Sequence, residues 1–138
     1  KKIVAAKESE NPVQWRISKS LNPKTFSVDD GKENTKMITD SVSWKINYPA
    51  IEQCKILGDK WYLPAIDEWY GVILNQKAIN KTLKKKDATL IDGRYWTSTQ
   101  YRFDENQVWQ WYDVGFYGVE QIDDETTRKV RPFLDVAK

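Results

Sequence analysis

The residue types that most often perform catalysis are scarce in this chain of 138 residues. It contains no His, so neither a Ser–His–Asp nor a Cys–His arrangement can be built, and the commonest general base is absent. The single cysteine, Cys54, falls in an apolar helical pattern, which favours a buried small residue over a nucleophile. The neighbouring acids Asp104 and Glu105, and those at 123–125, fall in expected turns, where carboxylates are normally solvated. We therefore expect no catalytic residues and no enzymatic activity.

The sequence also lacks the residue patterns that bind metals, cofactors or nucleic acids. One cysteine and no His give neither a disulfide nor a zinc or iron–sulfur cluster, so we expect no metal. The scattered glycines match no phosphate-cradling or dinucleotide pattern, so we expect no cofactor. The formal net charge of +2 gives no field to attract nucleic acid, and the basic stretch at 84–86 is interpreted as a solvated helix end. No stretch approaches the about 18 apolar residues of a membrane span.

Aromatic residues are the unusual feature of the composition, with seven Trp and seven Tyr. Nine aromatic residues fall between positions 95 and 117. In a strand over 107–114, alternation would place Val108, Tyr112 and Val114 on one face and Trp109, Trp111 and Asp113 on the other. Because both faces carry aromatic rings, a binding surface on one face and a core on both faces are both open. Trp and Tyr suit recognition, since each offers a large rigid area together with a polar group.

The elements that would position these residues form one domain over 1–138, of the α+β class. Residues 1–47 carry turn signals and short β-prone runs and predict strands and loops. A short amphipathic helix is predicted from Tyr48, ended by Gly58, with its apolar face formed by Tyr48, Ile51, Cys54, Ile56 and Leu57. A second helix follows Pro64 with first-turn acids and an apolar stripe made of Ile66, Trp69, Tyr70, Ile73 and Leu74. Residues 78–86 either extend it or form another short helix.

The composition and turn spacing of the last third of the chain are typical of antiparallel strands. Four strands are predicted, over 94–101, 107–114, 119–122 and 129–136. Polar or glycine-containing turns at 104–106, 115–118 and 123–125 would connect them.

Several separated motifs resemble, in order and spacing, one bacterial domain. They are the Asp-Gly…Asn-Thr-Lys opening at 30–36, Trp61-Tyr62-Leu63-Pro64-Ala65 with Glu68, Gly93 leading into Tyr95-Trp96-Thr97-Ser98-Thr99, Trp109, and Val130-Arg131-Pro132. Together they resemble the domain at the C-terminus of the Legionella collagen-like adhesin, over roughly 31–133. From the residues alone, we expect Pro64 to mark the exit from a strand into a helix, Trp96 to be core, and Arg131 to pair with a buried acid or a carbonyl.

The resemblance implies a C-type-lectin-like fold. In that fold two helices pack on a small twisted antiparallel sheet, the terminal strands are adjacent, and a long irregular loop region forms the ligand face. Similar domains are secreted or surface modules of bacteria, many from Bacteroides, and some are the diversified receptors of retroelement-driven variation systems. The resemblance implies binding without turnover, at the bacterial surface or after secretion.

The chain also departs from relatives that share this fold. The Glu-Pro-Asn and Trp-Asn-Asp triplets of calcium-dependent lectins are missing, so calcium-dependent sugar binding is unsupported. The sulfatase-activating oxidases need a cysteine pair, which one Cys cannot supply. Trp69 stands where the family usually has an aliphatic residue, which suggests a larger core pocket.

Two function hypotheses follow, with an uncharacterised enzyme a distant third. The first is an adhesin-like module that binds a glycan or protein of a host or cell surface through Tyr101, Arg102, Asp104, Asn106, Trp109, Trp111, Tyr112, Asp113, Phe116 and Tyr117. The second is a structural or assembly domain of a surface filament or lipoprotein, whose aromatic residues pack against other domains of the parent protein. A contiguous solvent-facing patch of Trp109, Trp111, Phe116 and Tyr117 would favour the first, and rings interdigitated with the helices the second.

Overall fold

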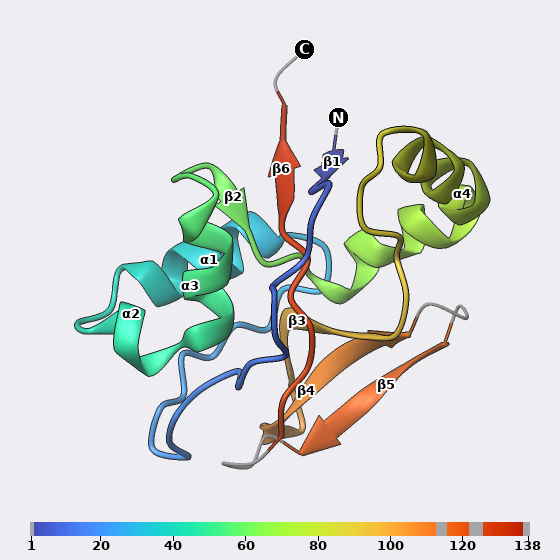
Figure 1. The fold of residues 1–138 in the computed structure, drawn as a ribbon. Coiled ribbons are helices and arrows are strands. Elements are labelled where there is room, and N and C mark those ends of the chain that lie inside the picture. Colours follow the sequence, from blue (N-terminus) through green and yellow to red (C-terminus); the bar gives the residue numbers. More distant parts are fainter. Residues whose placement is uncertain (1, 113–115, 122–125, 137–138) are drawn as a thin grey trace.

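Two small antiparallel sheets and a set of helices make up the fold (Figure 1). The computed structural model describes residues 2–112, 116–121 and 126–136. One sheet has the order β1-β6-β2 and the other the order β3-β4-β5. In chain order the elements are β1 (Lys2–Val4), α1 (Gly31–Thr39), α2 (Trp44–Asn47), α3 (Pro49–Ile56), β2 (Trp61–Tyr62), α4 (Ile66–Lys85), β3 (Arg94–Tyr101), β4 (Asp104–Tyr112), β5 (Phe116–Gln121) and β6 (Phe133–Asp135). The predicted α+β class is confirmed, and so is the pairing of the terminal strands, β1 and β6.

The first 47 residues differ from the prediction of strands and loops, because α1 and α2 lie there. Helix α1 begins after Asp30, whose side chain accepts a hydrogen bond from the Glu33 amide. Its buried face contains Asn34 and Thr35. These side chains bond to the backbone of Ser27 and Leu63, at 2.8 Å and 3.0 Å. Because the buried face of α1 is partly polar, its apolar residues do not recur clearly at helical spacing. The helix was therefore not predicted from the sequence.

The two predicted helices are confirmed, with corrected faces. Helix α3 ends before Leu57, and Gly58 follows with a φ of +141°. Ile56 and Leu57 are exposed, not part of its buried face. Helix α4 runs without a break to Lys85, so residues 78–85 extend it. Its buried face is Ile66, Trp69, Val72 and Leu83, whereas the predicted Tyr70 and Leu74 are exposed; the Ile73 side chain lies outside the described part.

The aromatic-rich third forms the predicted hairpins with shifted turns. Strand β3 has the predicted bounds. The predicted turn at 104–106 is wrong, because β4 already begins at Asp104 and the chain reverses at Arg102 and Phe103. Strand β5 begins at Phe116, within the predicted connection at 115–118, and β6 is shorter than the predicted strand. The predicted turn at 123–125 lies outside the described residues.

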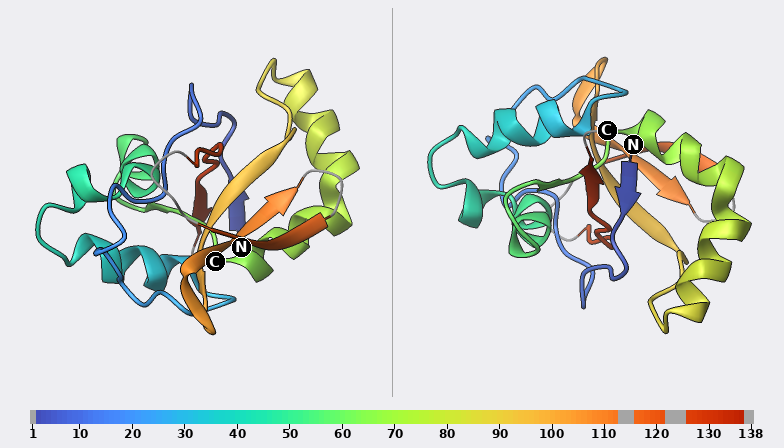
Figure 2. Two further views of the ribbon diagram at one scale, coloured as in Figure 1. Left: turned by 90° about the horizontal axis from the view of Figure 1, so that it is seen from below. Right: turned by 90° about the horizontal axis from the view of Figure 1, so that it is seen from above.

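Strand β3 is the centre of the molecule because a separate cluster of side chains packs on each of its faces. On one face Trp96 packs with Val108, Trp15 and residues of α1 and α3. On the other face Tyr95 packs with Trp111, Phe133 and the α4 residues Ile66, Trp69, Val72 and Leu83. Both views in Figure 2 show α4 on one side of β3 and α1 with α3 on the other. Trp96 is therefore a core residue, as predicted.

Glu68, in the first turn of α4, ties four segments together. One carboxylate oxygen accepts hydrogen bonds from the Gly31 and Ala65 amides, at 2.8 Å and 2.9 Å. The other accepts from the Tyr62 hydroxyl at 2.6 Å and lies 2.9 Å from the Lys2 ammonium. A Cβ at Gly31 would stand 2.5 Å from the Ala65 nitrogen, so only glycine lets α1 start this close to α4. Pro64 lies between β2 and α4, at the predicted strand exit.

Arg131 lies shortly before β6 and binds both the N-terminal segment and the connection between α4 and β3. Its fully buried guanidinium donates to the carbonyls of Ala5, Ala6, Thr89 and Leu90 at 2.6–3.3 Å. Its Nη1 also lies 3.4 Å from a Glu8 carboxylate oxygen. The expected pairing of Arg131 with a carbonyl is confirmed, and the acid beside it, Glu8, is half-buried.

Raising the pH above about 10 should destabilise the protein through Tyr62. Burial, and then the hydrogen bond to Glu68, raise the pKa of this phenol well above its usual value. The unfolded chain ionises it near pH 10 while the folded chain keeps it protonated, so its contribution is complete below about pH 10 and is lost above it. Urea unfolding between about pH 8 and 11 should show a steeper loss of stability for the wild type than for Tyr62→Phe. Equal slopes would rule out this role of Tyr62.

A candidate binding surface at the β3–β4 hairpin

Three aromatic rings gather where β3 turns into β4. The Tyr101 ring lies edge-on to Phe103 and to Trp109, with centroid distances of 5.6 Å and 5.9 Å. Phe103 stands at the turn itself and is 83% exposed, whereas Tyr101 and Trp109 are half-buried. We call Tyr101, Phe103 and Trp109, with the neighbouring Arg102, Asp104 and Asn106, the hairpin tip. Figure 2 shows this end of the hairpin at the edge of the molecule.

The hairpin tip is built on an irregular strand pair. Gln100 pairs with Val108, but Tyr101 pairs with Asp104, so the residues between Asp104 and Val108 form a bulge in β4. Within the bulge, the Asp104 carboxylate accepts hydrogen bonds from the Asn106 amide and from the Gln107 side chain, each at 3.0 Å. The bulge thus gives the polar groups of the tip fixed positions beside the rings.

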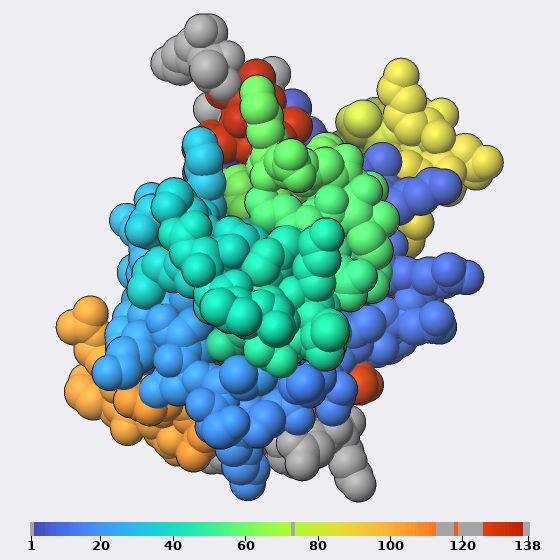
Figure 3. Space-filling view, turned by 90° about the vertical axis from the view of Figure 1, so that its left-hand side faces the viewer, coloured from blue at the N-terminus to red at the C-terminus, as the bar shows by residue number. Residues whose placement is uncertain are grey.

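The N-terminal segment supports the bulge from outside. Arg16, which is buried, donates to the Leu21 carbonyl at 2.8 Å and to the Asn106 side chain at 2.9 Å. The Gln100 side chain donates to Asn22 and to the Glu105 carbonyl, each at 3.0 Å. Asn22 also bonds to the Glu105 carboxylate. Figure 3 shows this contact as blue N-terminal residues beside the orange hairpin. A surface held in this way loses little conformational entropy when it binds.

The structure removes Trp111 from the predicted ligand face. Trp111 is fully buried, with its ring stacked on Trp69 at a centroid distance of 5.7 Å. Trp109 packs at the margin of the same cluster, so the predicted sharing of one face by Trp109 and Trp111 is confirmed. Of the two alternatives open for this strand, a core on both faces holds for Val108 to Trp111, because α4 covers one face and the cluster around Trp96 covers the other. Trp69 is likewise fully buried in this cluster.

The remaining predicted residues separate into two groups. Tyr101, Arg102, Asp104, Asn106 and Trp109 belong to the hairpin tip. Tyr112 lies at the other end of β4, opposite Arg94, whose guanidinium is 4.3 Å from the centroid of its ring. In β5, Phe116 and Tyr117 pair with Tyr112 and Trp111 along the backbone, so they too belong to that far end, although their side chains lie outside the described part. Asp113 is outside the described residues.

Two residues, one exposed at the hairpin tip and one buried beneath it, were not identified from the sequence. Phe103 was counted among the aromatic residues but not as a ligand contact; its position between Arg102 and Asp104 in a short turn is the signal that marks it as exposed. Arg16 lies far from the hairpin in the sequence, and no local pattern connects it with Asn106.

Three features of the described residues bear on metal binding, thiol chemistry and membrane insertion. No group of three or more His, Cys, Asp or Glu residues placed to hold a metal ion occurs in them. Burial raises the pKa of the Cys54 thiol well above its usual value, so the nucleophilic thiolate is disfavoured. By length and hydropathy, none of the described helices qualifies as a membrane-spanning segment.

Comparison with models of protein families, with curated proteins and with solved structures finds no match. The geometry of the molecule is therefore the basis for any proposal about its function.

Replacing Trp111 and Phe103 by alanine should have very different effects on stability. Trp111→Ala should cost about 3–5 kcal/mol, because it leaves a cavity beside Trp69. Phe103→Ala should change stability by less than about 0.5 kcal/mol, because the ring is largely in solvent. Urea unfolding monitored by circular dichroism measures both. Similar losses for the two variants would contradict the division into core and surface rings.

Proposed function

We propose that this chain is a non-catalytic, adhesin-like binding module of a secreted or cell-surface bacterial protein. It recognises a glycan or a protein through the hairpin tip. The observation that carries the proposal is the exposed Phe103 ring at a turn, next to Tyr101 and Trp109 and to polar groups in fixed positions.

The chemistry of the hairpin tip suits recognition of an amphipathic surface. The face of the Phe103 ring can pack on the apolar face of a sugar or on an apolar side chain of a protein. Arg102, beside it in the turn, is exposed and offers several donors in a fixed fork. The Asp104 carboxylate and the Asn106 side chain are held by the bulge and by Arg16, so they can orient a ligand without being ordered first.

The proposal includes a C-type-lectin-like fold. It is supported by the placement of the residues that carry the resemblance to the collagen-like adhesin domain. Asn34 donates to the Ser98 hydroxyl of β3, and Thr35 accepts from the Leu63 amide beside β2. Glu68 joins α1 to α4, and Arg131 holds the N-terminal segment. The adjacent strands β1 and β6 agree with the same fold. In this proposal these motifs build the scaffold that carries the hairpin tip.

The absence of turnover is supported by the residue types. The sequence has no His, and the one thiol is fully buried. The acid of the tip, Asp104, and its neighbour Glu105 already accept hydrogen bonds from other side chains.

The second candidate is a structural or assembly domain. It is favoured by the burial of Trp69, Trp96 and Trp111, which leaves a smaller exposed aromatic patch than the composition suggested. In that case Phe103 would pack against another domain of the parent protein instead of a separate ligand.

The two candidates can be separated with arrays of glycans and of host surface proteins. We expect the wild type to bind a subset of one array, and Arg102→Ala/Phe103→Ala to lose that signal by about tenfold or more. Lys45→Ala/Ile46→Ala, which removes a matched exposed pair on α2, is the control and should bind like the wild type. Equal binding by both double variants would contradict a ligand site at the hairpin tip. No signal on either array would favour the assembly candidate.

A further inference from the structure

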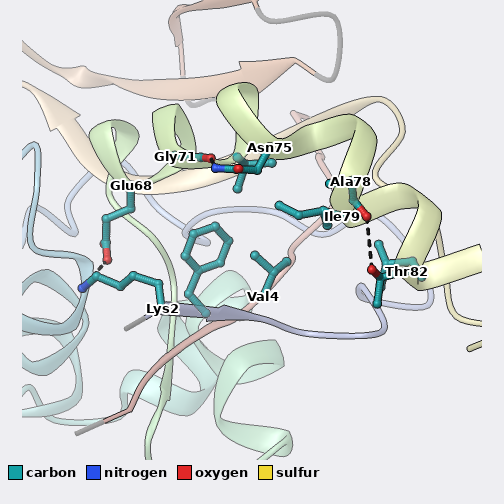
Figure 4. Close-up of a pocket in the computed structure, with 11 residues that line it drawn as sticks. Lys2, Val4, Glu68, Gly71, Asn75, Ala78, Ile79 and Thr82 are labelled. Atoms are coloured by element: carbon teal, nitrogen blue, oxygen red, sulfur yellow. Dashed lines mark hydrogen bonds and ion pairs between the residues drawn. The ribbon is translucent and has the colours of Figure 1, made fainter. Parts of the chain in front are cut away.

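A groove lies between α4 and the β1–β6 strand pair, away from the hairpin tip. It encloses about 600 Å³, a volume in the range of natural small-molecule sites. Its walls are mostly apolar and include Val72 and Ile79 of α4 and Val4 and Phe133 of the strands. Figure 4 shows Ile79 and Val4 on opposite sides of this space.

The strand side of the groove is a face of the strand pair. Lys2 and Val4 point to the same side of β1, and Phe133 is paired with Val4, so these three lining residues share one face. Just after β1, the Thr89 amide donates to the Ala6 carbonyl at 3.1 Å, so that part of the strand edge is occupied. A ligand on this face meets side chains and not backbone groups, which favours a small molecule over an added strand.

Small residues keep the helix side of the groove open. Gly71 and Ala78 lie seven residues apart on one face of α4, and both line the groove. A Cβ at Gly71 would meet no atom within 4 Å, and Gly71 lacks the positive φ that would require glycine. Glycine is less stable than alanine in a helix interior, so its use here costs stability and leaves space. The lining residues of α4 span positions 68–83, about 22 Å at 1.5 Å per residue, which suits an elongated molecule.

The charged end of the groove is already neutralised. Glu68 and Lys2 are the charged residues among those that line it. Each Glu68 carboxylate oxygen has two partners, so its four acceptor positions are used. The Lys2 ammonium lies 2.9 Å from Glu68 and 3.3 Å from Asp135, which leaves one of its three N–H groups for a ligand. A neutral acceptor can use this donor, whereas a charged head group would find no uncompensated partner in the groove.

The polar groups on the helix side are also neutral. The Asn75 side chain donates to the Gly71 carbonyl at 2.9 Å, and the Thr82 hydroxyl donates to the Ala78 carbonyl at 3.2 Å. These bonds leave the Asn75 Oδ1 and the Thr82 Oγ1 as acceptors beside the groove, where Figure 4 shows both side chains. The lysines within 77–86 do not line the groove, and solvent screens their charge. A hydroxyl group therefore matches this site, since it can donate to these oxygens and accept from Lys2.

We propose that the groove binds a neutral, single-chain amphiphile with hydroxyl groups on its head. The alkyl chain lies against Val72, Ile79 and Phe133. The head group lies at the solvent-exposed Lys2 end, where it accepts a hydrogen bond from the ammonium. This site is independent of the hairpin tip and of the function proposed for it.

The test uses the whole chain and three probes with the same ten-carbon chain, each below its micelle-forming concentration. They are 1-decanoylglycerol, which is neutral, decanoate and decylammonium. In ¹³C–¹H NMR titrations at pH 7, 1-decanoylglycerol should shift the methyl signals of Val4, Val72 and Ile79. It should bind at least about tenfold more tightly than either charged probe, because a charged head loses hydration without gaining a partner. 1-Octanoylglycerol should bind about tenfold more weakly than 1-decanoylglycerol, because it buries two fewer methylene groups.

Variants of α4 locate the site. Gly71→Leu fills the groove without a clash at its Cβ and should weaken binding of 1-decanoylglycerol by about tenfold or more. Ala78→Leu is a second filling variant and should act in the same direction; circular dichroism checks that both variants are folded. Leu74→Ala, at an 84% exposed position on the same helix, is the control and should leave affinity unchanged. Phe103→Ala should also bind normally, which separates this site from the hairpin tip.

Several outcomes would overturn the proposal. They are no methyl shifts with 1-decanoylglycerol, equal binding of the neutral and charged probes, and unchanged affinity in both folded filling variants. Tighter binding of decanoate would assign the groove to an anionic ligand. Dimers in light scattering that Gly71→Leu abolishes, without binding of any probe, would assign the groove to a second copy of the chain.

Discussion

Strand β3 is covered on both faces from Tyr95 to Gln100, and the rest of the structure is arranged around this burial. Helix α4 packs on one face and the α1–α3 region packs on the other, so neighbouring β4 residues also become core as far as Val108 and Trp111. Among the described aromatic residues the most exposed ring is Phe103, which stands where the hairpin extends past both layers. This is why Trp111 is core and Phe103 is surface, although both come from the same aromatic-rich stretch.

Buried polar side chains hold the layers in register where apolar contacts alone would not. Glu68 fixes the start of α4 against α1, β2 and β1, while Arg131 fixes the N-terminal segment to the strand region at the C-terminal end. Each is satisfied by several partners, as buried charged groups must be. The same anchoring sets β1 beside α4 without closing the space between them. A groove lined by residues of β1, β6 and α4 lies there, apart from the hairpin tip.

Sequence patterns predicted the elements with a simple period and missed those without one. The run from Arg94 to Tyr101 is rich in aromatic and hydroxyl β-formers, so β3 was predicted with its observed bounds. Helix α1 was missed because Asn34 and Thr35 occupy its buried face. Alternation correctly placed Trp109 with Trp111, but it could not show that α4 covers Trp111. The support of Asn106 by Arg16 depends on a contact across 90 positions, which no local pattern reveals.

The central claim is that burial of β3 divides the aromatic residues into core rings and a small exposed tip. Paramagnetic relaxation of aromatic ring protons by a soluble gadolinium chelate tests it directly in the free protein. Phe103 should relax strongly and Tyr101 and Trp109 moderately, while Trp69, Trp96 and Trp111 should be protected. Strong relaxation of Trp111, or protection of Phe103, would contradict the account.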